Sequence, residues 1–421
     1  MENGKLKNQQ QPGVFRRGRV WKVVAIFLIL AAALYWQPLY SAGPVQGYDS
    51  LRLLTEALYE ISQKFVYQKS EDEMMDGALR GMMNSLDPDS SFLSPLEYKD
   101  LRDGKKGQVA EAGVELIFKD HLLTVASALD NGPAYRTGLR QGDHILKVNG
   151  HLVRNLTGQE AARRFQGPPN TAIKLQVIRN GVVKPLDFTV TLEPLTGSSV
   201  NSQMVGDSLG YIRIGYFNDA THRDLASAIK ALQRQPTPLR GVVLDLRNNA
   251  RGTLEQGVRS ASVWLGDKQI ISTKGRIPET TQAYQGKVQD LAWKSPVPVV
   301  VLIDPGTARA AEVMAAALKD QAGAVLLGEK SLGLCGLNRL MPLPDGSALI
   351  MTVAQCYTVQ GHKIQGKGLE PDIPGKKLTA PVATSKDTPK PPSPDQDPWV
   401  IQAVEILKSG KPPKLAHKGD S

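Results

Sequence analysis

Residues Gly306-Thr307-Ala308-Arg309-Ala310-Ala311-Glu312 are the stretch of this 421-residue chain that decides its fold. The apolar run 297–303 precedes them and predicts a buried strand, while residues 310–318 predict an Ala-rich helix. A turn of small residues between a strand and a helix N-terminus is a common position for a reactive hydroxyl. The exposed position of this turn carries Arg309, which has no hydroxyl.

The chain around this turn alternates predicted strands and helices. Strands are expected at 209–214, 242–246, 298–303 and 324–328, and helices are expected to end near residues 232, 265 and 318. Such alternation is typical of an α/β fold with a mostly parallel sheet. The segment from Asp207 to Ile373 is therefore predicted to be an α/β core.

The other segments differ from this core in composition and period. Residues 48–102 have helical periodicity, and residues 104–195 show short strands and turns, including strands at 109–118, 122–126 and 173–177. Residues 196–205 are predicted to be a Gly/Ser-rich linker, and 378–397 a second linker before a short helix at 398–407. The predicted organisation is a basic segment 1–22, an apolar segment 23–40, a helical domain 48–102, a mostly-β domain 104–195, an α/β core 206–375 and a Pro/Lys-rich tail 376–421 with a short helix.

Five ordered motifs resemble those of the C-terminal processing (tail-specific, carboxyl-terminal) serine peptidases. They are Ser85-Leu86-Asp87-Pro88 with Ser90-Ser91-Phe92-Leu93, Gly113-Val114-Glu115-Leu116 with the run from Gly138 to Gly150, Gly241 to Asn249, Gly328-Glu329-Lys330, and Gln365 to Ile373. The resemblance implies a crotonase/ClpP-like α/β core, an inserted mostly-β PDZ domain and an N-terminal helical domain. It implies serine-type proteolysis without a cofactor.

The resemblance also assigns the site positions. In the family the turn reads Gly-Ser/Thr-Ala-Ser-Ala-Ser-Glu, and the Ser that attacks the peptide carbonyl matches Arg309. The family's general-base Lys matches Leu334, and the Gln that orients this Lys matches Asn338. The Asn-Pro-Gly-Gly turn beside the oxyanion site matches Asn249 to Gly252, so that Arg251 and Gly252 stand in the oxyanion-turn region.

These substitutions remove the chemistry of a Ser–Lys dyad. The dyad needs a hydroxyl that attacks and a neutral amine that takes its proton. Arg309 offers a guanidinium that does not deprotonate, and Leu334 has no titratable proton. The sequence therefore predicts a pseudopeptidase. The alternative is an active endopeptidase whose nucleophile is displaced, with Thr307, Ser331 or Cys335 as candidates beside Lys330.

A peptide-binding role can remain when catalysis is lost. The loop Gly113, Val114, Glu115 and Leu116 would offer backbone N–H groups to a C-terminal carboxylate, and the adjacent strand edge would pair with the peptide. The helix lining the groove is expected at 157–165, capped by Thr157 with Glu160 three residues on. The expected partners are protein C-terminal tails or an active homologous peptidase. The alternative is a domain that only packs against the core.

The N-terminus indicates export. Residues 23–36 are an unbroken apolar run with basic residues on its N-terminal side only. The positive-inside rule then predicts a cytoplasmic N-terminus, a signal anchor in the inner membrane at 23–40, and folded domains on the periplasmic or extracytoplasmic side. The run is short for a full span, so a cleaved signal peptide is the alternative.

Composition excludes other classes of function. The net charge of +10 comes from the two ends of the chain, and no basic stripe with interleaved aromatic residues appears, which argues against nucleic-acid binding. The 6 His residues do not form a metal-ligand pattern, so no metal site is expected. The sequence does not indicate an oligomeric state.

The two cysteines predict a disulfide. Cys335 and Cys356 are centred on Asp345-Gly346, a strong signal for a two-residue hairpin turn. In an antiparallel hairpin closed there the two cysteines face each other across the strands, near the reach of an S–S bond. An exported chain favours the bridge. Two separate buried thiols are the alternative, and a bulge in the hairpin would break the register.

Overall fold

The computed structural model describes residues 46–103, 110–119, 122–153, 158–195, 198–293, 297–376 and 393–410. The chain divides into two compact units, residues 1–75 and 76–421. The first contains α2, Gln46–Lys64, and the start of α3, Glu71–Asn84. The predicted basic segment 1–22 and anchor 23–40 lie outside the described residues. None of the helices within the described ranges is long and apolar enough to cross a membrane.

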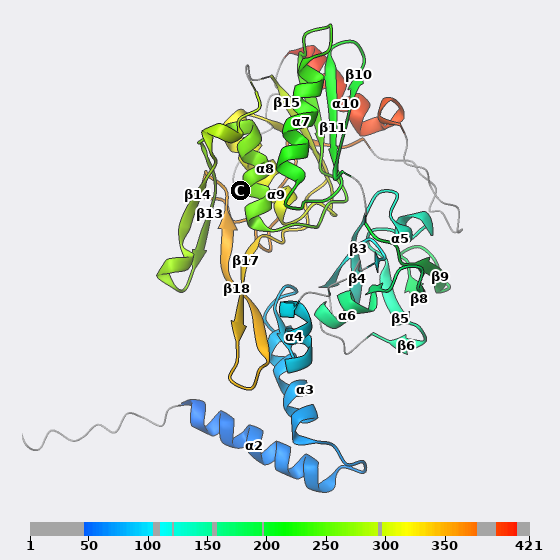
Figure 1. The fold of residues 1–421 in the computed structure, drawn as a ribbon, viewed down its shortest axis with the longest axis vertical. Helices are drawn as coiled ribbons and strands as arrows, with labels where there is room; N and C mark the ends of the chain where they lie inside the picture. Colours follow the sequence, from blue (N-terminus) through cyan, green and yellow to red (C-terminus); the bar gives the residue numbers. More distant parts are fainter. Residues whose placement is uncertain are drawn as a thin grey trace, which may run out of the picture. The chain divides into compact units, whose positions relative to one another are not determined.

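The second unit is built around a six-stranded sheet, of which β10, β11 and β15 are labelled in the upper part of Figure 1. Its order is β10-β11-β12-β15-β16-β19, with β10 antiparallel to β11 and the other neighbours parallel. The strands are β10 (Val200–Val205), β11 (Leu209–Ile214), β12 (Gly241–Asp245), β15 (Val299–Ile303), β16 (Val325–Gly328) and β19 (Ile373–Pro374).

Helices cover both faces of this sheet, which explains why its central strands are apolar throughout. Residues of β12 alternate between two clusters: Val242 and Leu244 pack with α7, α8 and α9, whereas Val243 packs with Trp399 and Val400 of α10. The helices are α7 (Thr221–Gln233), α8 (Leu254–Leu265), α9 (Ala310–Ala322) and α10 (Pro398–Ser409). The predicted α/β core is therefore a three-layer structure.

Two sequence predictions about the limits of this core are wrong. The predicted linker 196–205 contains β10, an edge strand of the sheet, so the core begins before residue 206. The helix predicted at 398–407 is observed as α10, but it belongs to the core and not to the tail, because Trp399 and Ala403 are buried against the sheet. The indole N–H of Trp399 donates to the carbonyl of Lys376 at 2.7 Å. Both β10 and α10 are buried on one face only, and the polar or Gly/Ser-rich residues around them in the sequence gave no signal that they belong to the core.

A second, five-stranded sheet extends from the core. Its strands are β1 (Ser91–Leu93), β13 (Gln269–Gly275), β14 (Gln282–Gln285), β17 (Gly336–Pro342) and β18 (Ala348–Tyr357). The long strand β18 pairs with β17, β13 and β1. The predicted helical domain 48–102 therefore also contributes a strand, between α3 and α4 (Pro95–Asp103).

Residues 110–195 form a separate mostly-β domain, the PDZ-like domain. Its strands β3 (Val114–Lys119), β4 (Leu122–Ala128), β5 (His144–Val148), β6 (His151–Leu152), β8 (Ala172–Ile178) and β9 (Leu186–Thr191) form one sheet, and β2 (Ala110–Glu111) pairs with β7 (Gln166–Gly167). Its helices are α5 (Pro133–Arg136) and α6 (Gly158–Arg164). The strand predicted at 109–118 is broken at Gly113, whose φ of +70° no strand residue adopts.

Candidate active site

The turn before α9 has the backbone of a nucleophile position. Arg309 is the residue before the helix, with φ 52° and ψ −118°. A residue with a side chain rarely adopts a positive φ, and such a conformation costs about 1–3 kcal/mol. A sharp, strained strand-to-helix turn is the geometry that exposes a nucleophile at the end of a buried strand. The geometry predicted for the turn is therefore present, with a guanidinium in place of a hydroxyl.

Backbone hydrogen bonds hold this turn from both sides. The N–H of Ala308 donates to the carbonyl of Asn249 at 2.9 Å, and the N–H of Arg309 donates to the carbonyl of Leu334 at 2.9 Å. Below them, the hydroxyl of Thr307 donates to the carbonyl of Leu246 at 2.9 Å. The turn is thus bonded to the loop after β12 and to the loop after β16, which brings positions 309 and 334 together.

All five predicted site positions line one cleft. Arg251, Gly252, Arg309, Leu334 and Asn338 surround a cavity of about 510 Å³ between the start of α8 and the start of β17. Gly252 has no space for a side chain, because a Cβ there would lie 2.4 Å from the Cβ of Phe217. Asn338 lies exposed on β17, where its amide oxygen accepts a hydrogen bond from Thr352 at 2.9 Å.

The side chain of Arg309 is bound on three sides. Its Nη2 donates to Asp89 at 2.6 Å, its Nη1 donates to the carbonyl of Ala250 at 2.6 Å, and Nη1 lies 3.8 Å from Glu115. Burial lowers the pKa of this guanidinium, but the carboxylates of Asp89 and Glu115 outweigh burial and raise the pKa above its ordinary value. Arg309 is therefore a permanent cation, suited to ion pairing and not to proton transfer.

Arg251 makes a similar set of contacts with the PDZ-like domain. Its Nε donates to Glu115 at 2.5 Å and its Nη2 donates to Glu111 at 2.5 Å. Burial lowers the pKa of Arg251, and the two glutamates raise it to a net value above the ordinary one. One guanidinium thus bridges the carboxylate of Glu111, in β2, and the carboxylate of Glu115, near the start of β3.

Leu334 occupies a small apolar cluster. Its side chain is buried in a group that contains Ala250 and Ala308 of the core together with Ile117 and Ala126 of the PDZ-like domain. A Lys at this position would extend into apolar surroundings, which lower the pKa of an amine. The position is therefore suited to a neutral base but holds an isobutyl group.

Each residue considered as a displaced nucleophile is held in a hydrogen bond or in the disulfide. Thr307 is fully buried and its hydroxyl bonds the carbonyl of Leu246 and the carboxylate of Asp304. The hydroxyl of Ser331 donates to the buried carboxylate of Glu312. Cys335 is in a disulfide, and Lys330 pairs with Glu370 at 2.6 Å on the surface. Within the described ranges, no group of three or more His, Cys, Asp and Glu side chains could hold a metal ion.

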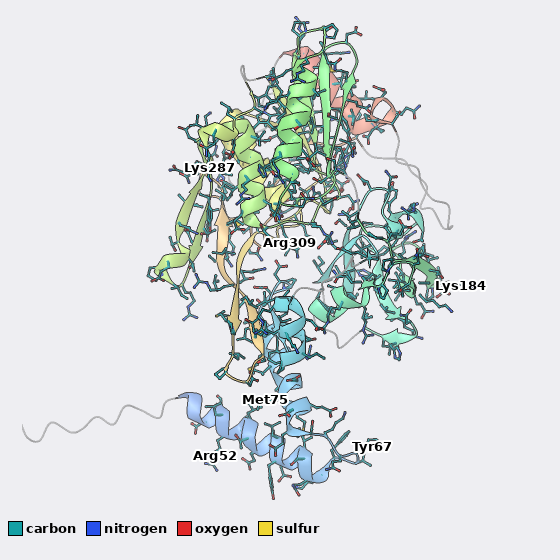
Figure 2. The ribbon with its side chains drawn as sticks, viewed as in Figure 1. Arg52, Tyr67, Met75, Lys184, Lys287 and Arg309 are labelled. Atoms are coloured by element: carbon teal, nitrogen blue, oxygen red, sulfur yellow. A yellow bond between two sulfur atoms is a disulfide. The ribbon has the colours of Figure 1, made fainter. Side chains whose placement is uncertain are left out.

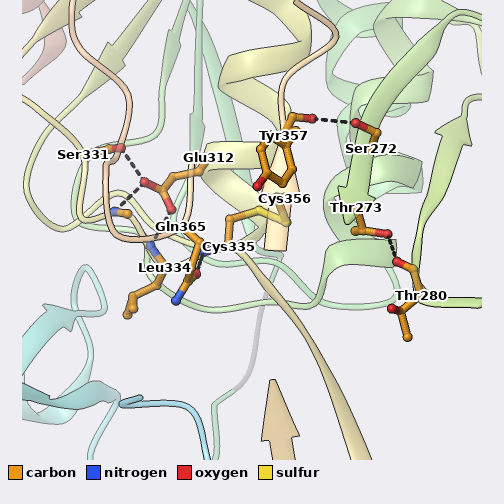
Figure 3. The surroundings of a disulfide bond; sticks show 11 residues. Ser272, Thr273, Thr280, Glu312, Ser331, Leu334, Cys335, Cys356, Tyr357 and Gln365 are labelled. Atoms are coloured by element: carbon orange, nitrogen blue, oxygen red, sulfur yellow. Dashed lines mark hydrogen bonds between the residues drawn. A yellow bond between two sulfur atoms is a disulfide. The ribbon is translucent and has the colours of Figure 1, made fainter. Parts of the chain in front are cut away.

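Glu312 ties the helix α9 to the loop that carries Leu334 (Figure 3). Besides the Ser331 hydroxyl, its carboxylate accepts the N–H of Gly333 at 2.7 Å and the N–H of Leu334 at 2.9 Å. Complete burial raises the pKa of Glu312 to about 7, although the hydrogen bonds from Ser331, Gly333 and Leu334 act to lower it. The sequence marked this residue only as the last of its motif.

The structure forms the disulfide between Cys335 and Cys356, with their Cα atoms 5.4 Å apart (Figure 3). The predicted two-residue turn is wrong, because the strands end at the pair Pro342 and Ala348, which leaves residues 343–347 in the loop and offsets the register by one residue. A bulge then shifts the register between Leu337 and Asn338 and adds one residue on β18. The two offsets cancel, so the cysteines still face each other.

The predicted peptide groove has the elements that β-augmentation needs. The strand β3 lies at the edge of its sheet, and α6 packs beside it. A cavity of about 290 Å³ lies between the loop 113–116 and the end of α6, and Arg251 and Arg309 also line it. The expected cap Thr157 and the side chain of Glu160 lie outside the described residues.

Sequence reasoning missed the acidic partners of the two arginines. Asp89 comes from the loop before β1, and Glu111 and Glu115 flank Gly113. Asp89 stands inside the motif Ser85 to Leu93, but its partner is 220 residues away along the chain. One signal in the sequence pointed to such a contact. Position 309 carries an arginine where the family pattern has a serine, and a partly buried guanidinium requires a carboxylate partner.

The protonation of Glu312 predicts a pH-dependent stability. Its native pKa of about 7 exceeds its ordinary value of 4.5, so the native state binds the proton more tightly. The free energy of unfolding therefore falls as the pH rises from about 4.5 to about 7, by up to about 3 kcal/mol. We expect Glu312→Gln to lack this fall, as measured by urea unfolding at pH 5 and pH 7.5. Replacement of the exposed Glu329 by Gln should leave the fall unchanged; parallel wild-type and Glu312→Gln profiles would contradict the assignment.

Comparison with known proteins agrees with the geometry. A model of peptidase family S41 matches residues 208–374, and a PDZ-domain model matches residues 124–179. The carboxy-terminal-processing protease of Bartonella bacilliformis is 33% identical over 356 residues, 84% of this chain and 81% of that protein. The carboxy-terminal processing protease CtpA of Bacillus subtilis is 30% identical over 324 residues, 76% of this chain and 68% of that protein.

The solved structures give the same result. The structure of a photosystem II D1 C-terminal processing protease superposes with a TM-score of 0.64 at 25% identity, over 77% of this chain and 92% of that chain. The domain at 110–195 is thus a PDZ domain, and the core has the S41 peptidase fold. The chain belongs to peptidase family S41, the family of the C-terminal processing proteases.

Proposed function

We propose that this chain is a pseudopeptidase that binds protein C-termini, or a partner peptidase, through its PDZ domain. The observation that supports the proposal most directly is the filling of the nucleophile position by Arg309, whose guanidinium is paired with Asp89 and the carbonyl of Ala250. A cation with a raised pKa, beside a buried Leu334, can neither attack a peptide carbonyl nor take a proton. Loss of a comparable catalytic unit lowers the rate by roughly a millionfold.

The PDZ domain retains the parts that bind a peptide C-terminus, although the core lacks a Ser–Lys dyad. The loop 113–116, the free edge of β3 and the helix α6 are the parts with which a PDZ domain takes up a peptide C-terminus. The substituted positions 251, 309 and 334 lie in the core and not in the PDZ domain, and Arg251 and Arg309 line the same cavity as the loop 113–116. The competing hypothesis, an endopeptidase with a displaced nucleophile, would need Thr307 or Cys335 to leave a hydrogen bond or a disulfide.

A binding and cleavage assay separates the two functions. We expect the purified chain to bind an unstructured peptide with a free C-terminal carboxylate, and to bind the C-terminal amide at least tenfold more weakly, as measured by fluorescence anisotropy. Gly113→Ala should weaken binding at least tenfold, because the φ of +70° at Gly113 disfavours a side chain. Gly181→Ala is the matched control, since Gly181 has a φ of +83° in the same domain.

Mass spectrometry of the same mixtures should show an uncut peptide. A fluorophosphonate probe should leave the chain unlabelled. Cleavage by the wild type that disappears in Thr307→Val or Cys335→Ala would sink the pseudopeptidase hypothesis.

Restoration of the dyad tests the positions themselves. We expect Arg309→Ser combined with Leu334→Lys to be labelled by the fluorophosphonate probe and to cleave the peptide, because the turn backbone is in place and the apolar pocket lowers the pKa of an amine. The matched control is Arg309→Ala with Leu334→Lys, which supplies the base without the hydroxyl.

A second restored variant adds Arg251→Gly and Asn338→Gln, which return the other two site positions to the family pattern. If this fourfold variant is folded by circular dichroism and still takes up no probe, the assignment of the dyad to positions 309 and 334 is wrong.

We also propose that residues 23–40 tether the chain to the inner membrane, with the folded domains outside the cytoplasm. The support is the apolar run with basic residues on its N-terminal side only. After cell fractionation the chain should remain with the membrane in high salt, and protease added to spheroplasts should digest it. A chain that is protected in spheroplasts or recovered in the soluble fraction would contradict the proposal.

A further inference from the structure

Three of the substituted site positions, Arg251, Arg309 and Leu334, share one property: each contacts the PDZ domain. Arg251 bonds to Glu111 and Glu115 at 2.5 Å each. Arg309 lies 3.8 Å from Glu115, and Leu334 packs in a cluster with Ile117 and Ala126. In the family pattern these positions hold Gly, Ser and Lys. The substitutions that remove the dyad are therefore also the side chains that meet the domain beside it.

Contact between the two domains brings the charges of this cluster together, with one negative charge in excess. Two guanidinium groups face three carboxylates, and their side chains are between 7% and 25% exposed. Glu111 and Glu115 belong to the PDZ domain and are bridged by one cation from the core. Separation of the domains would leave two neighbouring carboxylates without their shared cation, and Arg251 without its two anions. The lost attraction favours the docked arrangement, and hydration of the separated charges offsets part of it.

Close packing continues into the turn itself. A Cβ added to Gly306 would lie 2.6 Å from Nε2 of Gln141 and 3.1 Å from the carbonyl of Ala126, both in the PDZ domain. Figure 2 labels Arg309, which follows Gly306 by three residues in this turn. The PDZ domain thus packs against the turn at Gly306.

We propose that the former active site of this chain is a docking surface for its own PDZ domain, in which Arg251, Arg309 and Leu334 hold that domain against the core. The surface replaces a catalytic cleft by an ion-paired and apolar contact between domains. The docking does not require that the groove binds a peptide, so it goes beyond the proposed function. Further ties at the end of β4, Arg213 to Asp130 at 2.7 Å and Asn248 to Ala128 at 3.0 Å, would act as the pivot when the docking surface is broken.

An interdomain distance measurement tests the docking. Lys184 in the PDZ domain and Lys287 in the core are both exposed and are marked in Figure 2. Nitroxide labels on Lys184→Cys and Lys287→Cys report the distribution of the distance between the two domains by pulsed electron paramagnetic resonance. We expect a narrow distribution for the wild-type background. Glu111→Lys with Glu115→Lys turns both attractions to Arg251 into repulsions and should at least double the width. Adding Arg251→Glu rebuilds the pairs with opposite signs and should restore the narrow distribution.

The control is Asp187→Lys, which breaks the hydrogen bond with Gln176 at 3.3 Å inside the PDZ domain and should leave the width unchanged. An unchanged width in the double Lys variant, or a broad distribution that Arg251→Glu does not narrow, would overturn the inference. The wild-type chain is also assayed with the free-carboxylate peptide. A narrow distance distribution without peptide binding would count against the proposed function alone, and peptide binding with an unchanged width in the double Lys variant would count against this inference alone.

Discussion

The positive-φ backbone at Arg309 is the constraint on which the site depends. It turns the chain from β15 into α9 while the N–H groups of Ala308 and Arg309 bond to the carbonyls of Asn249 and Leu334. Strain at a single residue persists where the surrounding bonds over-determine it. The turn is held by backbone groups, so its shape does not depend on the side chain at position 309. A hydroxyl can therefore be replaced by a guanidinium without loss of the fold.

The replacement has an electrostatic consequence. A half-buried guanidinium must be paired, and the carboxylates within reach are Asp89 from the loop before β1 and Glu115 from the PDZ domain. Arg251 repeats the pattern with Glu111 and Glu115. The guanidinium groups of Arg251 and Arg309 thus form ion pairs with carboxylates that are distant from them in the sequence. In this chain the same side chains stand at the site positions and contact the PDZ domain.

Much of the fold could be predicted from local pattern. The strand at 209–214 is observed with the predicted bounds, and the Ala-rich helix begins at Ala310 as predicted, because buried parallel strands and helices have distinct apolar periods. The strand β10 was missed because its residues between Val200 and Val205 are mostly polar and exposed. The burial of α10 was missed because the apolar face of an amphipathic helix does not indicate which part of the protein it packs against. The cysteine pairing was reached although the turn was wrong, since a bulge compensated for the longer loop.

By itself the sequence determined the α/β core, the PDZ domain and the identity of the groups at the site, because these follow from local periodicity and from ordered motifs. That no hydroxyl stands at position 309 and no amine at position 334 is likewise a fact of sequence. Only the tertiary structure decided which carboxylates pair with Arg251 and Arg309, and that Leu334 packs against Ile117 of another domain. Such contacts join residues more than a hundred positions apart, and their geometry depends on how the domains fold and meet, which no local pattern encodes.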